Sequence, residues 1–74
     1  MQNTGTNQIE IVVNGQIRFV GGGQTLSELL VSLMVDPARV AVELNRSIIN
    51  RKDWDQTNVA AGATLEIVQF VGGG

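Results

Sequence analysis

Residues 9–34 read IEIVVNGQIRFVGGGQTLSELLVSLM, and this stretch predicts two strands followed by one helix. The runs 9–13 and 16–20 are rich in β-branched and apolar residues, as is typical of strands. Between them stands Asn14-Gly15, a pair that favours a hairpin turn because both residues tolerate positive φ. The sequence therefore predicts a β-hairpin over residues 9–20.

The register of this hairpin decides which side chains face the core. A two-residue turn would pair Val13 with Gln16 and place Ile11 opposite Arg18. One additional loop residue would instead pair Val13 with Ile17 and place Ile11 opposite Phe19. Since the second register gives one continuous apolar face, we expect a loop longer than two residues, with a bulge near the turn glycine.

A glycine triplet at 21–23 ends the second strand, and a helix follows. Thr25 and Glu28 have the spacing of a capping box, in which each side chain satisfies a free backbone N–H. Five apolar residues then recur at helical spacing: Leu26, Leu29, Leu30, Leu33 and Met34. We expect the helix to end at Asp36-Pro37, because the residue before proline disfavours helical backbone.

The second half of the chain predicts two further strands and some irregular structure. VAVEL at 40–44 and TLEIVQFV at 64–71 are strand-like, 47–50 can add a short extended piece, and 51–55 resembles a helical turn that packs Trp54 on the core. One amphipathic helix must cover one face of the sheet for either to bury its apolar side. We predict an α+β, β-grasp fold, with a mixed four- to five-stranded sheet packed on one main helix.

Composition restricts what a domain of 74 residues can do. The chain has no cysteine and no histidine, which removes the commonest nucleophile, general base and metal ligands. Its net charge of -2 argues against nucleic acid, and no apolar run is long enough to span a membrane. We expect a cytoplasmic monomer that is no enzyme, binds no cofactor or metal, and has a polar lead-in at 1–8, a domain at 9–71 and a flexible tail at 72–74.

The C-terminal glycines are the strongest candidate for a working site. Residues without a Cβ atom make a narrow chain end that can enter another enzyme's active site. Alternation along the last strand puts Leu65 and Ile67 toward the helix, and leaves Val68 and Phe70 partly exposed beside the tail. With Val71, the latter two form a candidate partner interface, since clustered exposed apolar side chains mark interaction surfaces. Tucking of Phe70 over the sheet edge is the alternative.

LEIVQFVGGG at 65–74 resembles the C-terminus of the ThiS sulfur carriers of thiamine biosynthesis. LNRSIINRKDW at 44–54 is similar to another segment of that family, as are Asn14-Gly15 and the Gly-Gln-Thr-Leu entry to the helix. The resemblance extends from Ile9 to Gly74. It departs from the family at Asn50, where proline is common, and at Ala63, where aspartate often follows the glycine.

The resemblance implies a ubiquitin-like carrier that supplies a reacting group and no catalytic residue. An E1-like adenylating enzyme, using ATP and magnesium, would convert the carboxylate of Gly74 to an acyl-adenylate. Sulfur from cysteine, supplied by a cysteine desulfurase or another donor, would then displace AMP and leave a thiocarboxylate for thiazole synthase. Gly72 and Gly73 would give the carboxylate its reach.

Other functions remain open at this point. The small subunit of molybdopterin synthase is a sulfur carrier that resembles this fold and also ends in diglycine. A β-grasp interaction module would keep its affinity without the terminal glycines, and a protein modifier would form conjugates with target proteins.

Overall fold

The computed structural model describes residues 7–70, and its first two strands form the predicted hairpin. β1 (Gln8–Val13) pairs antiparallel with β2 (Gln16–Gly21). The two turn residues have φ values of 50° for Asn14 and 82° for Gly15. Both are positive, as a tight two-residue hairpin turn requires, and such turns match the right-handed twist of the strands.

The predicted longer loop is therefore wrong. Val13 pairs with Gln16, and Ile11 lies opposite Arg18. As a result Ile17 and Phe19 lie on the sheet face away from the helix, where they are 61% and 65% exposed. The prediction required β2 to bury Ile17 and Phe19, but β2 is an edge strand. Near the turn it has no helix to cover it, and Val20 alone is buried from this strand.

The helix α1 (Leu26–Ser32) begins as predicted and ends earlier. Thr25 and Glu28 form both hydrogen bonds of the capping box. At the other end Met34 has φ 63°, its N–H donates to the Val31 carbonyl, and the Val35 N–H donates to the Leu30 carbonyl. This is a Schellman motif, which closes the helix before Asp36-Pro37 is reached.

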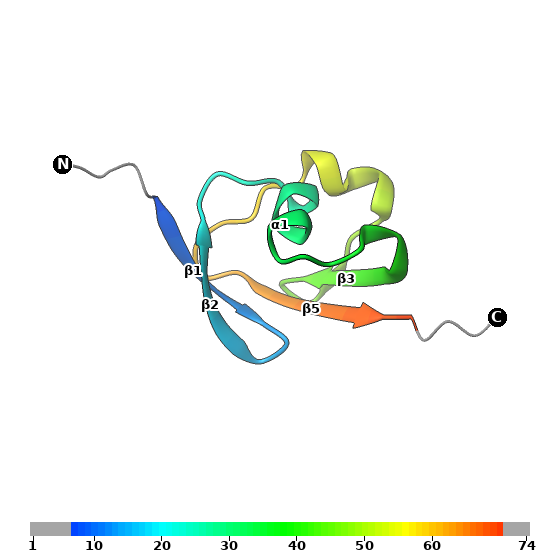
Figure 1. Cartoon of the computed structure of the whole chain (residues 1–74), viewed down its shortest axis with the longest axis horizontal. Helices are drawn as coiled ribbons and strands as arrows, with labels where there is room; N and C mark the ends of the chain where they lie inside the picture. Colours follow the sequence, from blue (N-terminus) through cyan, green and yellow to red (C-terminus); the bar gives the residue numbers. More distant parts are fainter. Residues whose placement is uncertain (1–6, 71–74) are drawn as a thin grey trace.

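Two strands complete the sheet together with one short edge strand. β3 (Val40–Leu44) pairs antiparallel with β4 (Ser47–Ile48) and with β5 (Thr64–Gln69). β5 also runs parallel to β1, so the strand order is β2-β1-β5-β3-β4 (Figure 1). The predicted mixed sheet on one main helix is confirmed, with five strands.

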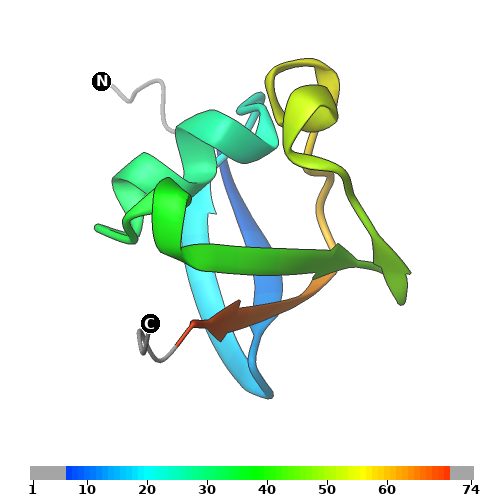
Figure 2. The ribbon, with the colours of Figure 1, turned by 90° about the vertical axis from the view of Figure 1, so that its right-hand side faces the viewer.

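Two 3₁₀ segments, η1 (Pro37–Arg39) and η2 (Arg51–Gln56), complete the order of elements. In Figure 2, η2 lies beside α1 on the same side of the sheet. The predicted helical turn with Trp54 on the core is confirmed, since Trp54 is 3% exposed. The Trp54 indole N–H donates to the Ile49 carbonyl at 3.0 Å, which satisfies the polar atom of the buried ring.

Arg51 fixes η2 to the start of β3. Its guanidinium lies 5.0 Å from the centre of the Trp54 ring and donates to the carbonyl oxygens of Pro37 and Val40. Planar stacking together with forked donation is characteristic of arginine. Arg51 therefore stabilises the fold by joining η2 to the start of β3.

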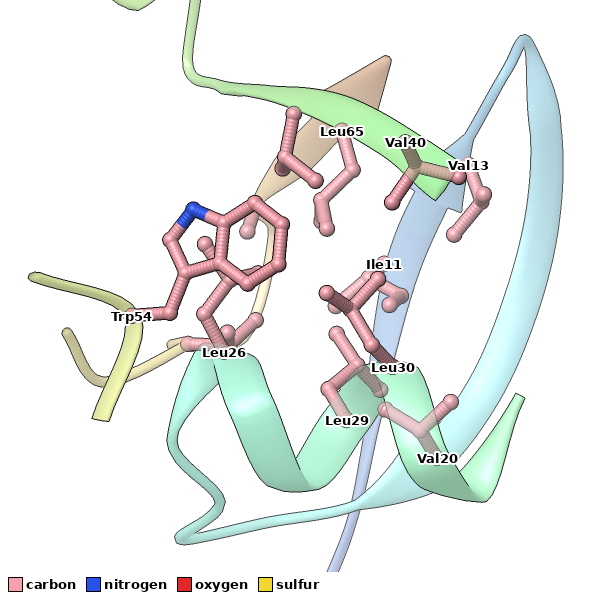
Figure 3. Close-up of a cluster of buried hydrophobic side chains, with 12 residues drawn as sticks. Ile11, Val13, Val20, Leu26, Leu29, Leu30, Val40, Trp54 and Leu65 are labelled. Carbon is pink, nitrogen blue, oxygen red and sulfur yellow. The ribbon is translucent and has the colours of Figure 1, made fainter. Parts of the chain in front are cut away.

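The core fills the space between α1 and one face of the sheet (Figure 3). Its completely buried side chains come from α1, β1 and β5: Leu26, Leu29, Leu30, Ile11 and Leu65. The buried part of the helix-facing layer is entirely apolar within residues 7–70, which contain no buried charged or polar residue. The opposite face of the sheet has no covering layer in this part of the chain. No helix within residues 7–70 is both long and apolar enough to cross a membrane.

Candidate functional site

β5 is the element that leads to the glycine tail, and both of its sides are held. On one side it pairs with β3 from Val40↔Gln69 to Leu44↔Leu65. The Phe70 N–H donates to the Arg39 carbonyl at 2.8 Å, which extends this ladder past the strand. The backbone is therefore fixed by hydrogen bonds as far as Phe70.

On its other side, β5 is held by the hairpin turn. β1 pairs with β5 only at Val12↔Thr64 and Val13↔Leu65. Beyond this point the Asn14 side chain replaces the strand, because its Oδ1 accepts from the Ile67 N–H at 2.7 Å and its Nδ2 donates to the Ile67 carbonyl at 3.2 Å. Asn14 thus contributes to both the turn and the position of β5.

The predicted alternation along β5 is confirmed. Leu65 is fully buried and Ile67 half-buried against the helix side, whereas Val68 is 59% and Phe70 52% exposed. Two of the three predicted interface residues thus have the exposure that contact with a partner requires. Val71 and the three terminal residues, Gly72, Gly73 and Gly74, lie outside the described residues.

Val68 borders a shallow hollow of about 200 Å³ on the uncovered face of the sheet. Ala41 lies opposite Val68, Glu43 opposite Glu66, and Ile48 opposite Glu43. We call the hollow that Ala41, Glu43, Ile48, Glu66 and Val68 line the outer hollow. The sequence prediction included only Val68 from this group as an interface residue. Alternation along β3 and β5 places Ala41, Glu43 and Glu66 each on one face of its strand, and the strand pairing brings them together with Ile48.

A second apolar group lies on the same face of the sheet, on the hairpin. Val12 pairs with Ile17, and Phe19 follows Ile17 by two residues on β2. The predicted register placed Ile17 and Phe19 on the same apolar face as Val13 and Ile11, so it missed this exposed group. The correct two-residue turn would have revealed it.

The helix side of the sheet has a hollow of about 220 Å³ near the end of β5. It is lined by apolar residues at the core's edge, such as Leu33 and Val35, and by Arg18, Asn14 and Gln69. Arg18 is the cation in this lining, and it lies on the sheet face opposite to Val68.

Three of the four acidic residues outside the sheet, Glu28, Asp36 and Asp55, have side-chain partners within residues 7–70. Glu28 caps α1, Asp36 accepts from the Ala38 N–H and pairs with Arg39 at 3.4 Å, and the Ser27 hydroxyl donates to Asp55. Within residues 7–70 no three His, Cys, Asp or Glu side chains come together as a metal site. What this part of the chain presents near the end of β5 is an exposed apolar surface that includes Val68 and Phe70.

Comparison with known proteins identifies relatives of this arrangement. The model of the ThiS family matches residues 7–74. The sulfur carrier protein ThiS of Escherichia coli (strain K12) is 33% identical over 66 residues, which cover 89% of this chain and 100% of that protein. The crystal structure of the thiamine biosynthesis protein ThiS from Geobacter metallireducens superposes with a TM-score of 0.78 at 36% identity, and covers 89% of this chain and 100% of that one.

Longer relatives match as well. A thiazole synthase of Paramagnetospirillum magneticum is 41% identical over 66 residues. The match covers 89% of this chain and 20% of that protein. The chain therefore spans about a fifth of this relative's length, and the larger protein has a segment similar to this whole domain.

Proposed function

Because this chain belongs to the ThiS family, we propose that it is a sulfur carrier of thiamine biosynthesis whose terminal carboxylate, on Gly74, carries the sulfur atom. One observation carries the proposal: the similarity spans the full length of a curated sulfur carrier of nearly the same size. The geometry supports the proposal, because hydrogen bonds fix the backbone of β5 and of the residue that follows it, as far as Phe70. The glycines begin two residues later in the sequence.

The proposed chemistry begins with activation of an unreactive group. A carboxylate is a poor electrophile, so an E1-like enzyme with ATP and magnesium joins a carboxylate oxygen of Gly74 to AMP and releases pyrophosphate. Sulfide supplied by a donor then attacks the carbonyl carbon, and the bond to AMP breaks to leave a thiocarboxylate. If a cysteine desulfurase delivers the sulfur as a persulfide, the same attack gives an acyl disulfide, and a thiol reductant cleaves its S–S bond to release the thiocarboxylate. The chain acts as a co-substrate in these steps and supplies no catalytic residue.

The glycine tail suits this role for steric reasons. Gly72 and Gly73 have no side chains, so they pass through a narrow channel and place the Gly74 carboxylate in a partner's active site. Val68, Phe70 and Val71 then contact the surface around the channel entrance. Contact there favours delivery of the tail, because the strand that carries Val68 also leads to the glycines.

Thiazole synthase is the proposed acceptor of the sulfur. Proteins of that name contain a segment similar to this chain. Two functions joined in one polypeptide in some organisms are commonly performed by interacting proteins in others. The thiocarboxylate would accordingly be consumed by thiazole synthase during ring formation.

Intact-mass measurement tests the proposal. The full chain is incubated with its cognate adenylating enzyme, ATP, magnesium and a sulfur source. We expect the mass to rise by the difference between sulfur and oxygen, with fragmentation locating the exchange on Gly74. An unchanged mass would refute the carrier function, provided that the same enzyme preparation is shown to adenylate another carrier protein. Conjugates with lysine side chains would indicate a protein modifier instead.

A further inference from the structure

The outer hollow contains two carboxylates that the fold does not require. Glu43 and Glu66 are direct cross-strand neighbours on the sheet face that no helix covers. Like charges directly opposite each other destabilise an antiparallel pair. Glu43 is half-buried and Glu66 is exposed.

No cation of the described chain neutralises this pair. The ion pair within residues 7–70 joins Asp36 to Arg39, and no side-chain hydrogen bond there involves Glu43 or Glu66. Arg51 donates to two carbonyl groups, and Arg18 lies on the opposite face of the sheet. Neither Arg46 nor Lys52 forms an ion pair with Glu43 or Glu66 within residues 7–70. The residues outside 7–70 contain no lysine or arginine. The pair therefore has no ion-pair partner within residues 7–70.

Apolar side chains surround the two carboxylates. Val68 is 59% and Ile48 74% exposed, and Ala41 lies directly opposite Val68. An apolar surface of this kind accepts the methylene stem of a long basic side chain. The two adjacent carboxylates then accept hydrogen bonds from the charged end of that side chain.

Arginine matches this combination better than lysine. Its guanidinium is planar and has five N–H donors in a fixed fork, so one side chain can donate to both carboxylates at once. Charge-assisted hydrogen bonds of this type are roughly twice as strong as neutral ones. A lysine ammonium supplies the charge without the fork.

We propose that the outer hollow receives an arginine side chain of thiazole synthase, which docks the carrier through the Glu43–Glu66 pair. This inference rests on the proposed function for the identity of the partner. The hollow includes Val68, and β5 continues from Val68 to the tail. A partner bound there is therefore close to the point from which the glycines depart. The carboxylate pair thus lowers the stability of the free carrier and raises its affinity for the partner.

The test compares glutamine variants of the full chain. Glu43→Gln, Glu66→Gln and the double variant keep the side-chain size and remove charge. We expect the double variant to bind purified thiazole synthase about tenfold or more weakly, since removing one side of a hydrogen-bonded charge pair mainly raises the dissociation rate. Its affinity should also depend less on salt concentration. The melting temperature of the free variant should rise, because the repulsion is gone.

Glu10→Gln is the matched control. Glu10 is an exposed carboxylate on the same sheet face, on β1, outside the outer hollow. The Glu10→Gln variant makes the same charge change as either single variant, and its affinity should stay within about twofold of wild type, as for a rim charge. Unchanged affinity of the double variant, or a loss for Glu10→Gln equal to that of the single variants, would overturn the proposal.

The failure of this inference can be distinguished from failure of the carrier function. The mass exchange on Gly74 reports the carrier function in the wild-type chain alone. If the exchange occurs and the glutamine variants bind thiazole synthase normally, the inference alone is wrong. If the wild-type chain does not bind thiazole synthase, the inference is refuted whatever the mass shows.

Discussion

Asn14 shows how one residue can serve two parts of the fold. Asn14-Gly15 predicts the turn from its sequence alone, because both residues tolerate the positive φ that the turn requires. The two hydrogen bonds from the Asn14 side chain to Ile67 join residues 53 positions apart. A contact of that range depends on the parallel pairing of β1 with β5, so the local sequence does not reveal it.

Asn14→Asp separates the turn from the bridge to β5. Aspartate tolerates positive φ and keeps an acceptor for the Ile67 N–H, but it replaces the donor to the Ile67 carbonyl with a second oxygen. We expect a loss of about 1 kcal/mol in the free energy of unfolding at neutral pH, the usual net value of one hydrogen bond. Urea denaturation measures it.

The pH dependence of that loss checks its cause. The folded state disfavours the introduced carboxylate, so the penalty is present where the group is ionised. It should shrink as acid protonates the group and restores an O–H donor. A deficit relative to wild type that stays constant down to acid pH would show that the bridge to Ile67 is not responsible.

Phe70→Ala tests the predicted interface at the tail. Phe70 is 52% exposed and follows β5, so its truncation removes contact area for a partner and little of the core. We expect binding to the adenylating enzyme to weaken by about tenfold or more, as for an aromatic interface residue, with a change of only a few degrees in melting temperature.

Phe19→Ala is the control for this effect. Phe19 is 65% exposed on the hairpin part of the sheet. The same truncation there should leave the affinity near that of wild type. A large drop in melting temperature for Phe70→Ala with unchanged affinity would instead place Phe70 in the fold.

At the scale of elements, the sequence predicts most strands and the start of the helix well, because those signals are local. Thr25 and Glu28 are a capping pair, and β3 has the predicted bounds. The helix end was wrong, since a Schellman motif normally shows a glycine where this chain has Met34. The hairpin register was wrong because pattern alone does not reveal that β2 is an edge strand.

Met34→Gly should therefore stabilise the protein. Met34 has φ 63° and is 93% exposed, so the side chain contributes strain and almost no packing. A left-handed conformation costs a residue with a Cβ atom roughly 1–2 kcal/mol, and glycine avoids this cost. Part of the gain is lost, because glycine has more conformational freedom in the unfolded chain and loses it on folding. We expect a net gain of about 0.5–1 kcal/mol in thermal or urea unfolding. Met34→Ala keeps the Cβ atom and should give no such gain.

At the scale of the molecule, the fold and the family follow from the sequence, and the site follows only in part. The predicted mixed sheet with one helix and the ThiS family are confirmed. Val68 and Phe70 were found because alternation along one strand is a local pattern. The rest of the outer hollow is Glu66 on β5 together with residues of β3 and β4, and these come together only through the pairing of Glu43 with Glu66 and with Ile48. Strand pairing across the sheet was the missing information.

The two glycine triplets of the chain allow folding and function to be separated. A Cβ atom on Gly22 would lie 2.8 Å from the backbone oxygen of Asn7, closer than such atoms approach, and the Gly22 N–H donates to that same oxygen. Gly22→Ala should therefore lower the free energy of unfolding by about 1–3 kcal/mol, the usual cost of overpacking. Sulfur transfer to the remaining folded protein should be unaffected.

Gly73→Val should have the opposite effect. It keeps a terminal carboxylate on Gly74 and adds a branched side chain where the tail must be narrow, so it should reduce thiocarboxylate formation without changing the melting temperature. Thermal melts and intact-mass measurements on both variants provide the test. If Gly73→Val accepts sulfur at the wild-type rate, the narrowness of the tail has no role. The assignment of the C-terminal triplet to passage through a partner's channel would then be wrong.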